Sequence, residues 1–253
     1  MIVSVAQTQL FILALTRTLA ILVKIPALGG QMIPNQIKIG LGILLTIVLV
    51  PWQLLPPESE PWGIIPFGFA IGEQLLIGTL AGFAAEMVFK ALEIAGEMMG
   101  LSSGFFAAKI INPAFETKGS PMTNLFYMVG VTFFVLIDGH HLFLIALQRT
   151  FEILPLGGPI PEISVEKVVT LVASLITAGV QMSLPIVAAI MFTNISLGLL
   201  ARVAPQIQVF FLGIPLRVGL GMFALMITIS SLLPILEDLY QSSAKWSLEL
   251  LVR

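Results

Sequence analysis

A long apolar stretch from Asn194 to Met222 constrains the fold most strongly, because prolines and polar side chains interrupt it. Proline lacks a backbone N–H and clashes with the preceding helical turn, so we expect Pro205 and Pro215 to break the helix here. Polar side chains occur in the same stretch at Arg202, Gln206, Gln208 and Arg217. Broken backbone at membrane depth is stable only where protein or a water-filled cavity surrounds it. The stretch therefore predicts protein neighbours.

The composition indicates an all-α, polytopic membrane-type protein. Of the 253 residues, 57% are hydrophobic and 10% are charged, whereas soluble domains carry about 25% charged residues. The mean hydropathy of +1.03 agrees with a membrane protein. A net charge of −2 provides no basic patch, so we expect no nucleic-acid partner. The absence of cysteine excludes disulfides and thiolate metal sites.

The apolar runs predict a single subunit over residues 1–253, built of helical hairpins with short and proline-broken helices. A helix that crosses a membrane needs about 20 residues, so the short run at 39–50 suits a re-entrant or oblique helix. The predicted helices cover residues 10–25, 39–50, 64–104, 124–147, 168–201 and 209–236.

Four charged residues in the third run share one helix face. Glu86, Lys90, Glu93 and Glu97 follow one another at intervals of four, three and four. Each would cost about 2.5–3.5 kcal/mol at the centre of a lipid-exposed helix. We therefore expect this face to be buried against protein, and the Glu86–Lys90 spacing suits an ion pair one helical turn apart.

Glycines at four-residue spacing follow on the same run. Gly96, Gly100 and Gly104 form a small-xxx-small pattern, which lets helix backbones approach closely inside a membrane. We expect them to line a close helix contact important for assembly. Packing glycines without any further role are the alternative.

The segment from residue 104 to residue 121 is a loop of unusual composition. It is marked by glycine and proline, yet it is apolar, whereas loops normally run through water and are polar. We therefore expect it to pack into a protein interior. Its candidate residues are Gly104, Phe105, Phe106, Ala107, Ile110, Ile111, Asn112 and Pro113.

Motifs in several places resemble the FliR family, the R-type subunit of the flagellar type III export gate, whose injectisome counterparts are related. The C-terminal residues that carry the resemblance are Asn194, Arg202, Ala204, Pro205, Gln206, Gly213 and Pro215. Earlier matching segments are Ala95–Gly96–Glu97, Gly104–Phe105, Ala107, Asn112–Pro113, Gly139–His140 and Leu154–Pro155–Leu156–Gly157. The family usually has aspartate where this chain has Asn112, so a carboxylate role there is not expected.

The resemblance implies a subunit that helps to form and close the channel through which unfolded flagellar proteins are exported. The family assembles with P-type and Q-type gate subunits into a hetero-oligomeric ring, together with the B-type gate protein. It works in the bacterial inner membrane, at the flagellar basal body. The resemblance also implies that the 104–121 loop is a plug, and Gly139–His140 favours the flagellar branch.

Two other function classes compete with this interpretation. An ion- or proton-coupled transporter would use Glu73, Glu86, Glu93 and Glu97 as a proton relay, with a substrate site near the Pro205–Pro215 break. An intramembrane metalloenzyme would use His140 and His141 beside Asp138, but these ligands are sparse and no His-Glu-x-x-His pattern occurs. Since no catalytic triad or phosphate loop is recognisable, we expect neither an enzyme nor a cofactor.

Overall fold

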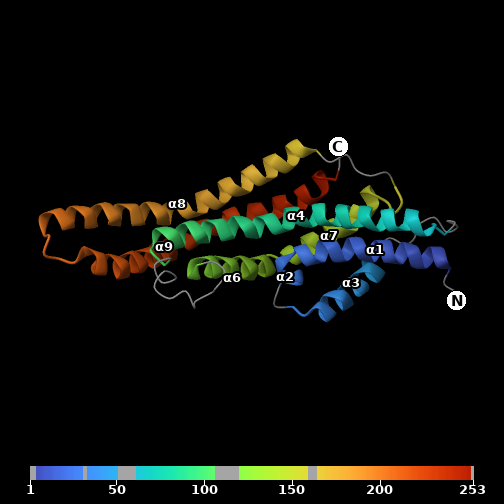
Figure 1. Ribbon diagram of the computed structural model, residues 1–253, viewed down its shortest axis with the longest axis horizontal. Helices are drawn as coiled ribbons and strands as arrows, with labels where there is room; N and C mark the ends of the chain where they lie inside the picture. The colour runs from blue at the N-terminus through green and yellow to red at the C-terminus, as the bar shows by residue number, and fades with distance from the viewer. Residues whose placement is uncertain (1–3, 31–32, 51–60, 106–119, 159–163, 252–253) are drawn as a thin grey trace. The chain divides into compact units, whose positions relative to one another are not determined.

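A computed structural model describes residues 4–30, 33–50, 61–105, 120–158 and 164–251, which form α-helices without a strand among them (Figure 1). The expected all-α, polytopic membrane-type fold is confirmed. The chain divides into two compact units, each assembled from segments that are distant in sequence.

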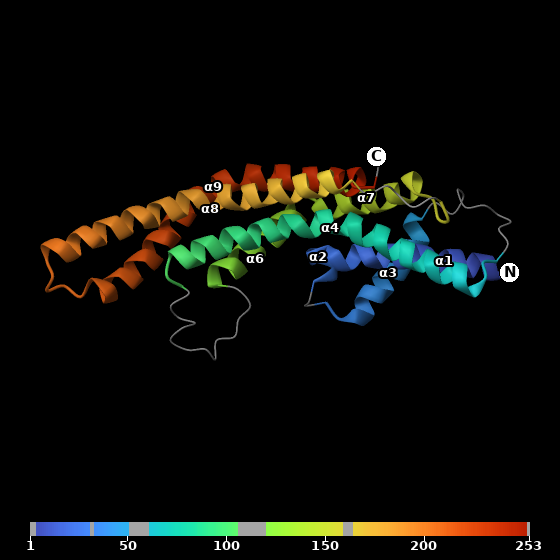
Figure 2. The same ribbon diagram turned by 45° about the horizontal axis from the view of Figure 1, so that its top comes forward.

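The first unit comprises residues 1–88, 134–172 and 239–253. It contains α1 (Val5–Lys24), α2 (Pro26–Gly29), α3 (Asn35–Leu49), the first part of α4 (Ile64–Ser102) and α7 (Gly139–Ile153). Helix α1 begins with a capping box, in which the Gln7 backbone N–H donates to Ser4 Oγ and the Ser4 N–H donates to Gln7 Oε1. Helix α3 lies beside α1 in both views (Figures 1 and 2).

Side-chain amide bonds join the start of the chain to the segment that precedes α4. Gln9 Nε2 donates to the Trp62 carbonyl at 2.8 Å, and the Trp62 backbone N–H donates to Gln9 Oε1 at 2.9 Å. The indole of Trp62 also approaches Gly157, where an added Cβ atom would lie 3.0 Å from it. Gly157 has a φ of +77°, a conformation that glycine adopts without strain. Trp62 therefore links three segments of the first unit.

The second unit comprises residues 89–133 and 173–238. It holds the second part of α4, most of α6 (Pro121–Leu136) and most of the antiparallel pair α8 (Val165–Val203) and α9 (Val209–Glu249). Its buried apolar side chains include Leu92, Met99, Phe126, Met182, Ile186 and Ile190. Helices α4 and α8 approach closely at Gly179, where a Cβ atom would lie 2.8 Å from the Ala91 carbonyl oxygen.

Two expectations about helix breaks need correction. Helix α8 ends just before Pro205 as expected, but Pro215 lies inside the continuous helix α9, so the break expected there is wrong. The single span expected at 124–147 is instead two helices, α6 and α7. They are separated at Asp138, whose φ of 54° is left-handed and cannot continue a right-handed helix. The turn at Asp138 therefore divides the expected span.

By length and composition, four helical segments of the described chain could cross a membrane: α1, α4, α8 and residues 211–230 of α9. The α6–α7 pair would add a fifth as one broken span, whereas α3 is shorter. The most apolar windows of α1 and α4 are 50% and 56% buried, but those of α8 and residues 211–230 are only 22% and 17% buried. The α8–α9 pair thus leaves most of its apolar surface for lipid or for another protein.

Candidate functional site

The most deeply buried charge in the described structure is Arg17 of α1. Its side chain is 0% exposed, and its guanidinium lies 4.6 Å from the centre of the Phe151 ring. Nε donates to Gln74 Oε1 of α4 at 2.8 Å, and Nη1 donates to the carbonyls of Thr150 and Leu154 at 2.9 and 2.7 Å. Thr150 lies in the last turn of α7 and Leu154 is its C-cap residue, so Arg17 binds the carboxyl end of α7.

Glycines of α4 bring this helix into direct contact with α1. A Cβ atom on Gly78 would lie 2.7 Å from the Arg17 carbonyl oxygen, and one on Gly82 would lie 2.7 Å from Lys24 Cβ. Small residues at this spacing allow such close approach. Lys24 Nζ then reaches Glu86 Oε2 at 2.8 Å, so an ion pair closes the same helix contact.

The four charged residues expected on one face of α4 have different surroundings. Glu86, Glu93 and Glu97 are half-buried, whereas Lys90 is exposed in the isolated chain. The ion pair expected between Glu86 and Lys90 is replaced by Lys24–Glu86 and by Lys90–Glu93, whose atoms are 2.7 Å apart. Glu97 Oε2 accepts a hydrogen bond from Thr123 Oγ1 at 2.8 Å. Each of the three carboxylates thus has its own partner: Lys24 for Glu86, Lys90 for Glu93 and Thr123 for Glu97.

Gly96 and Gly100 pack against the beginning of α6. A Cβ atom on Gly96 would lie 2.6 Å from Thr123 Cα, and one on Gly100 would lie 2.6 Å from Ser120 Cβ. Ser120 caps α6, since the Thr123 backbone N–H donates to its Oγ at 3.2 Å. Ser120, the last residue before α6, is therefore held against α4.

The other end of this loop leaves α4 through a turn. Gly104 has a φ of +80°, which a residue with a side chain adopts only with strain, and no atom of the described residues lies within 4 Å of its Cβ position. Gly104 therefore supplies the turn, and the close contact expected for it stays a prediction. Phe105 is half-buried. The other candidate plug residues, Phe106, Ala107, Ile110, Ile111, Asn112 and Pro113, lie outside the described residues.

The polar and proline residues near the α8–α9 turn are mostly exposed in the isolated chain. This group comprises Arg202, Pro205, Gln206, Gln208 and Pro215. Gly213 is buried and Arg217 is half-buried, and a Cβ atom on Gly213 would lie 3.2 Å from Arg217 Nη2 and 3.3 Å from Leu197 Cδ1 of α8. This chain alone therefore does not bury the residues that the sequence assigns to assembly.

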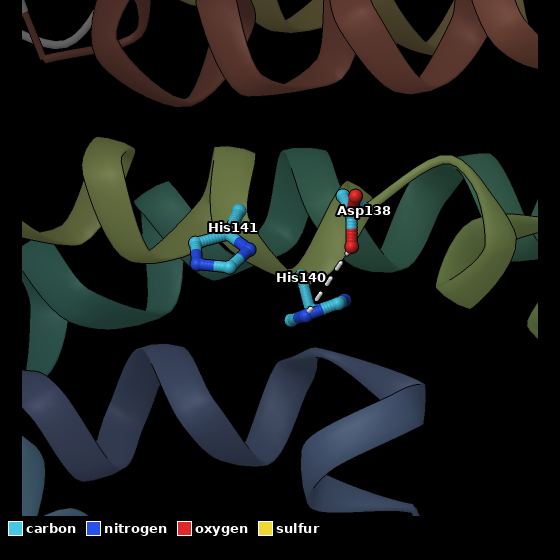
Figure 3. Close-up of side chains that lie close together, drawn as sticks. All are labelled: Asp138, His140 and His141. Atoms are coloured by element: carbon cyan, nitrogen blue, oxygen red, sulfur yellow. Dashed lines mark ion pairs between the residues drawn. The ribbon is translucent and has the colours of Figure 1, made fainter.

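Asp138, His140 and His141 gather at the start of α7 (Figure 3). His140 Nε2 lies 3.9 Å from Asp138 Oδ1, and one atom of each residue lies within 4.8 Å of the others. Zinc bonds of 2.0–2.2 Å would bring such ligand atoms to about 3.4 Å apart. Asp138 is also 76% exposed, and His140 Nδ1 is buried without the hydrogen-bond partner that normally orients a metal-binding imidazole. We therefore assign no metal to this cluster.

Comparison with known proteins identifies the class. The family described as "Bacterial export proteins, family 1" matches residues 8–243, and the chain belongs to this family. The flagellar biosynthetic protein FliR of Escherichia coli (strain K12) is 30% identical over 234 residues, which cover 92% of this chain and 88% of the relative. The FliR protein of Caulobacter vibrioides is 28% identical over 92% of this chain and 94% of its own length.

A relative outside the flagellar proteins also matches. The Yop proteins translocation protein T of Yersinia pestis is 25% identical over 221 residues, which cover 86% of this chain and 84% of the relative. The resemblance to the FliR family, deduced from the motifs, is confirmed by these matches.

Sequence reasoning missed the Arg17–Gln74 connection. The signal was present, since Arg17 is a cation in the middle of an apolar helix, and such residues are expensive unless they are paired. Its partners could not be identified in the same way, because two of them are backbone carbonyls at the end of α7.

Proposed function

We propose that this protein is a subunit of the flagellar type III protein export gate, where it helps to form and close the channel for unfolded flagellar proteins. The observation that carries this proposal is the family match, which extends over residues 8–243. Similarity to FliR over about nine-tenths of both chains supports the flagellar system. The sparsely buried apolar helices α8 and α9 suit a subunit that is completed by neighbours.

The partners of this subunit follow from the same proposal. It assembles with P-type and Q-type gate subunits in a ring and contacts the B-type gate protein, while exported flagellar proteins pass as transient cargo. Its location is the bacterial inner membrane, at the flagellar basal body. The exposed residues at the α8–α9 turn support such neighbours, because Arg202 and Gln206 would be costly against lipid.

The 104–121 loop is the proposed plug of the channel. The resemblance to the family's plug and the apolar side chains of the loop support this role, since an apolar constriction can close a pore by dewetting. The role is one of transport rather than catalysis, and the protein acts without a cofactor.

Removal of the protein from a motile host tests the proposal. A strain that lacks the chain should export no flagellin and assemble no filament, and a plasmid copy should restore both. The exported proteins are measured in the culture medium, with total cellular flagellin as the control for synthesis. Normal filaments in the deletion strain would refute the proposed function. Substrate-dependent ion flux through the purified chain in liposomes would instead support a transporter.

A further inference from the structure

The part of α8 and α9 that lies between Lys167 and Glu237 carries two arginines and no carboxylate. Arg202 and Arg217 are the only charged residues between Lys167 and Glu237. Among the described residues, no ion pair joins either arginine to a carboxylate. Arginine stays protonated in proteins, so each guanidinium needs an acceptor wherever water is excluded.

Arg217 lies in the seam between the two helices. Gly213 and Gly221 lie one turn before and one turn after it on α9, and both are buried. A Cβ atom on Gly213 would meet Leu197 of α8 at 3.3 Å, and one on Gly221 would meet Ile190 of α8 at 3.5 Å. Arg217 therefore lies on the line of α9 that faces α8.

The guanidinium of Arg217 lies along its own helix, with Nη2 over Gly213. Its Nε is buried and has no hydrogen-bond partner among the described residues. A buried donor without a partner is destabilising, so the arrangement favours an acceptor that approaches the seam from outside this chain.

The surface around the seam is suited to a protein helix. Exposed apolar side chains near the turn include Ile195 (57%), Leu199 (60%), Phe211 (70%) and Leu216 (41%). Arg202 in the last turn of α8 adds a second cation. A helix that buries these apolar groups would place a carboxylate in a water-poor environment, where its hydrogen bonds to a guanidinium are strong.

We propose that Arg217, assisted by Arg202, binds an aspartate or glutamate on a membrane helix of another export-gate subunit, with that helix packed along the α8–α9 seam. This inference rests on the proposed function and adds to it the docking surface and the chemistry of the partner. A lipid phosphate is the competing acceptor, and the experiments below separate the two.

Zero-length cross-linking tests the contact directly. In Arg217→Lys the amine would lie beside the partner carboxylate, and a membrane-permeant carbodiimide would join the two through an amide bond. Mass spectrometry of the intact complex should find the lysine at position 217 linked to an aspartate or glutamate of another protein. The matched control is Arg149→Lys, an exposed position on α7. A complex that assembles normally but gives no link from position 217 to another protein would overturn the inference.

Charge reversal provides the second measurement. Arg217→Glu should lower the yield of complex recovered from membranes by at least about tenfold, because breaking a buried charge pair is strongly destabilising. Arg217→Lys and the exposed control Arg149→Glu should stay within about twofold of the parent. Recovery of Arg217→Glu at the parental level would overturn the docking role and favour lipid phosphate as the acceptor. If the parent chain co-purified with no export component, the proposed function itself would fail.

Discussion

Arg17 Nε donates a hydrogen bond to Gln74 Oε1 at 2.8 Å, across 57 positions of sequence. Both side chains are almost fully buried, at 0% and 1% exposed. Because Arg17 also bonds to two carbonyls at the end of α7, this single residue joins α1, α4 and α7. An arginine at this position would be costly if it faced lipid, but here its side chain holds three helices of the first unit together.

Replacing Arg17 should destabilise the first unit. Arg17→Met would leave Gln74 Oε1 and the carbonyls of Thr150 and Leu154 without this donor. We expect a loss on the order of 3 kcal/mol in the free energy of unfolding, measured by denaturant titration in detergent. The free energy of unfolding of Arg17→Lys should lie between those of the parent and of Arg17→Met, since an ammonium cannot reproduce the planar set of donors of a guanidinium. Arg149→Met, at an exposed position, is the control, and an equal effect of the two methionine variants would contradict the junction.

Gly78 and Gly72 form a matched pair on α4. Gly78→Ala would place its Cβ atom 2.6 Å from Ala20 Cβ and 2.7 Å from the Arg17 carbonyl oxygen, whereas at Gly72 no atom of the described part of the chain lies within 4 Å. Gly78→Ala should therefore cost about 1–3 kcal/mol by overpacking. Gly72→Ala should be neutral or stabilise by about 0.5–1 kcal/mol, because alanine favours helix. Thermal unfolding in detergent measures both, and equal melting temperatures would show that α1 and α4 are not in close contact.

Gly96 and Gly100 should differ in how well they tolerate a methyl group. Alanine at Gly96 would meet the Thr123 backbone, while alanine at Gly100 would meet the Ser120 side chain. Gly96→Ala should therefore be the more disruptive. Adding Ser120→Gly should rescue Gly100→Ala, because glycine is also an acceptable helix cap. The measurement is the yield of chain recovered in the assembled complex, and failure of the rescue would count against a direct Gly100–Ser120 contact.

The Lys24–Glu86 pair should show charge-swap behaviour. Its side chains are 36% and 29% exposed, so we expect a coupling of up to about 1 kcal/mol. Lys24→Glu and Glu86→Lys should each destabilise the protein, and the double swap should recover most of the loss. A double-mutant cycle of unfolding free energies measures the coupling. If the two substitutions change the free energy of unfolding additively, Lys24 and Glu86 have no coupling energy.

The plug hypothesis predicts a leaky gate. Deletion of residues 107–115 should leave the complex assembled but raise its ion conductance, because the proposed apolar barrier is removed. Conductance is measured in planar bilayers with the purified complex. Alanine at Phe105, which retains the loop, is the milder comparison. If the deletion complex conducts ions no better than the parent, the loop does not close the channel and has only a packing role.

Most of the helices of this fold could be predicted from hydrophobic runs, because backbone groups in a membrane must bond within the helix. The break at Asp138 was harder, since only a left-handed residue inside an apolar run distinguishes two helices from one. Pro215 led to the opposite error, because a break was expected at a position where helix α9 is continuous. Helices in membranes tolerate proline where neighbours supply the lost bond, so a proline alone does not locate a helix end.

The assembly residues illustrate a different limit. Spacing placed Glu86, Lys90, Glu93 and Glu97 on one face, but it could not choose Lys24 as the partner of Glu86, because that pairing depends on how α1 packs against Gly82. Similarly, the Arg202 and Gln206 positions are exposed in this chain. Under the proposed function their neighbours belong to other subunits, whose sequences this chain does not contain.

The link that Gln9 and Gly157 make with Trp62 has an optical consequence. Indole emission depends on local polarity and packing, and Trp62 is half-buried where the start of α1 and the turn after α7 meet. With Trp52 and Trp246 changed to phenylalanine, the remaining fluorescence would come from this junction alone. The protein thus contains its own spectroscopic reporter, able to show in real time when distant parts of the chain come together during insertion.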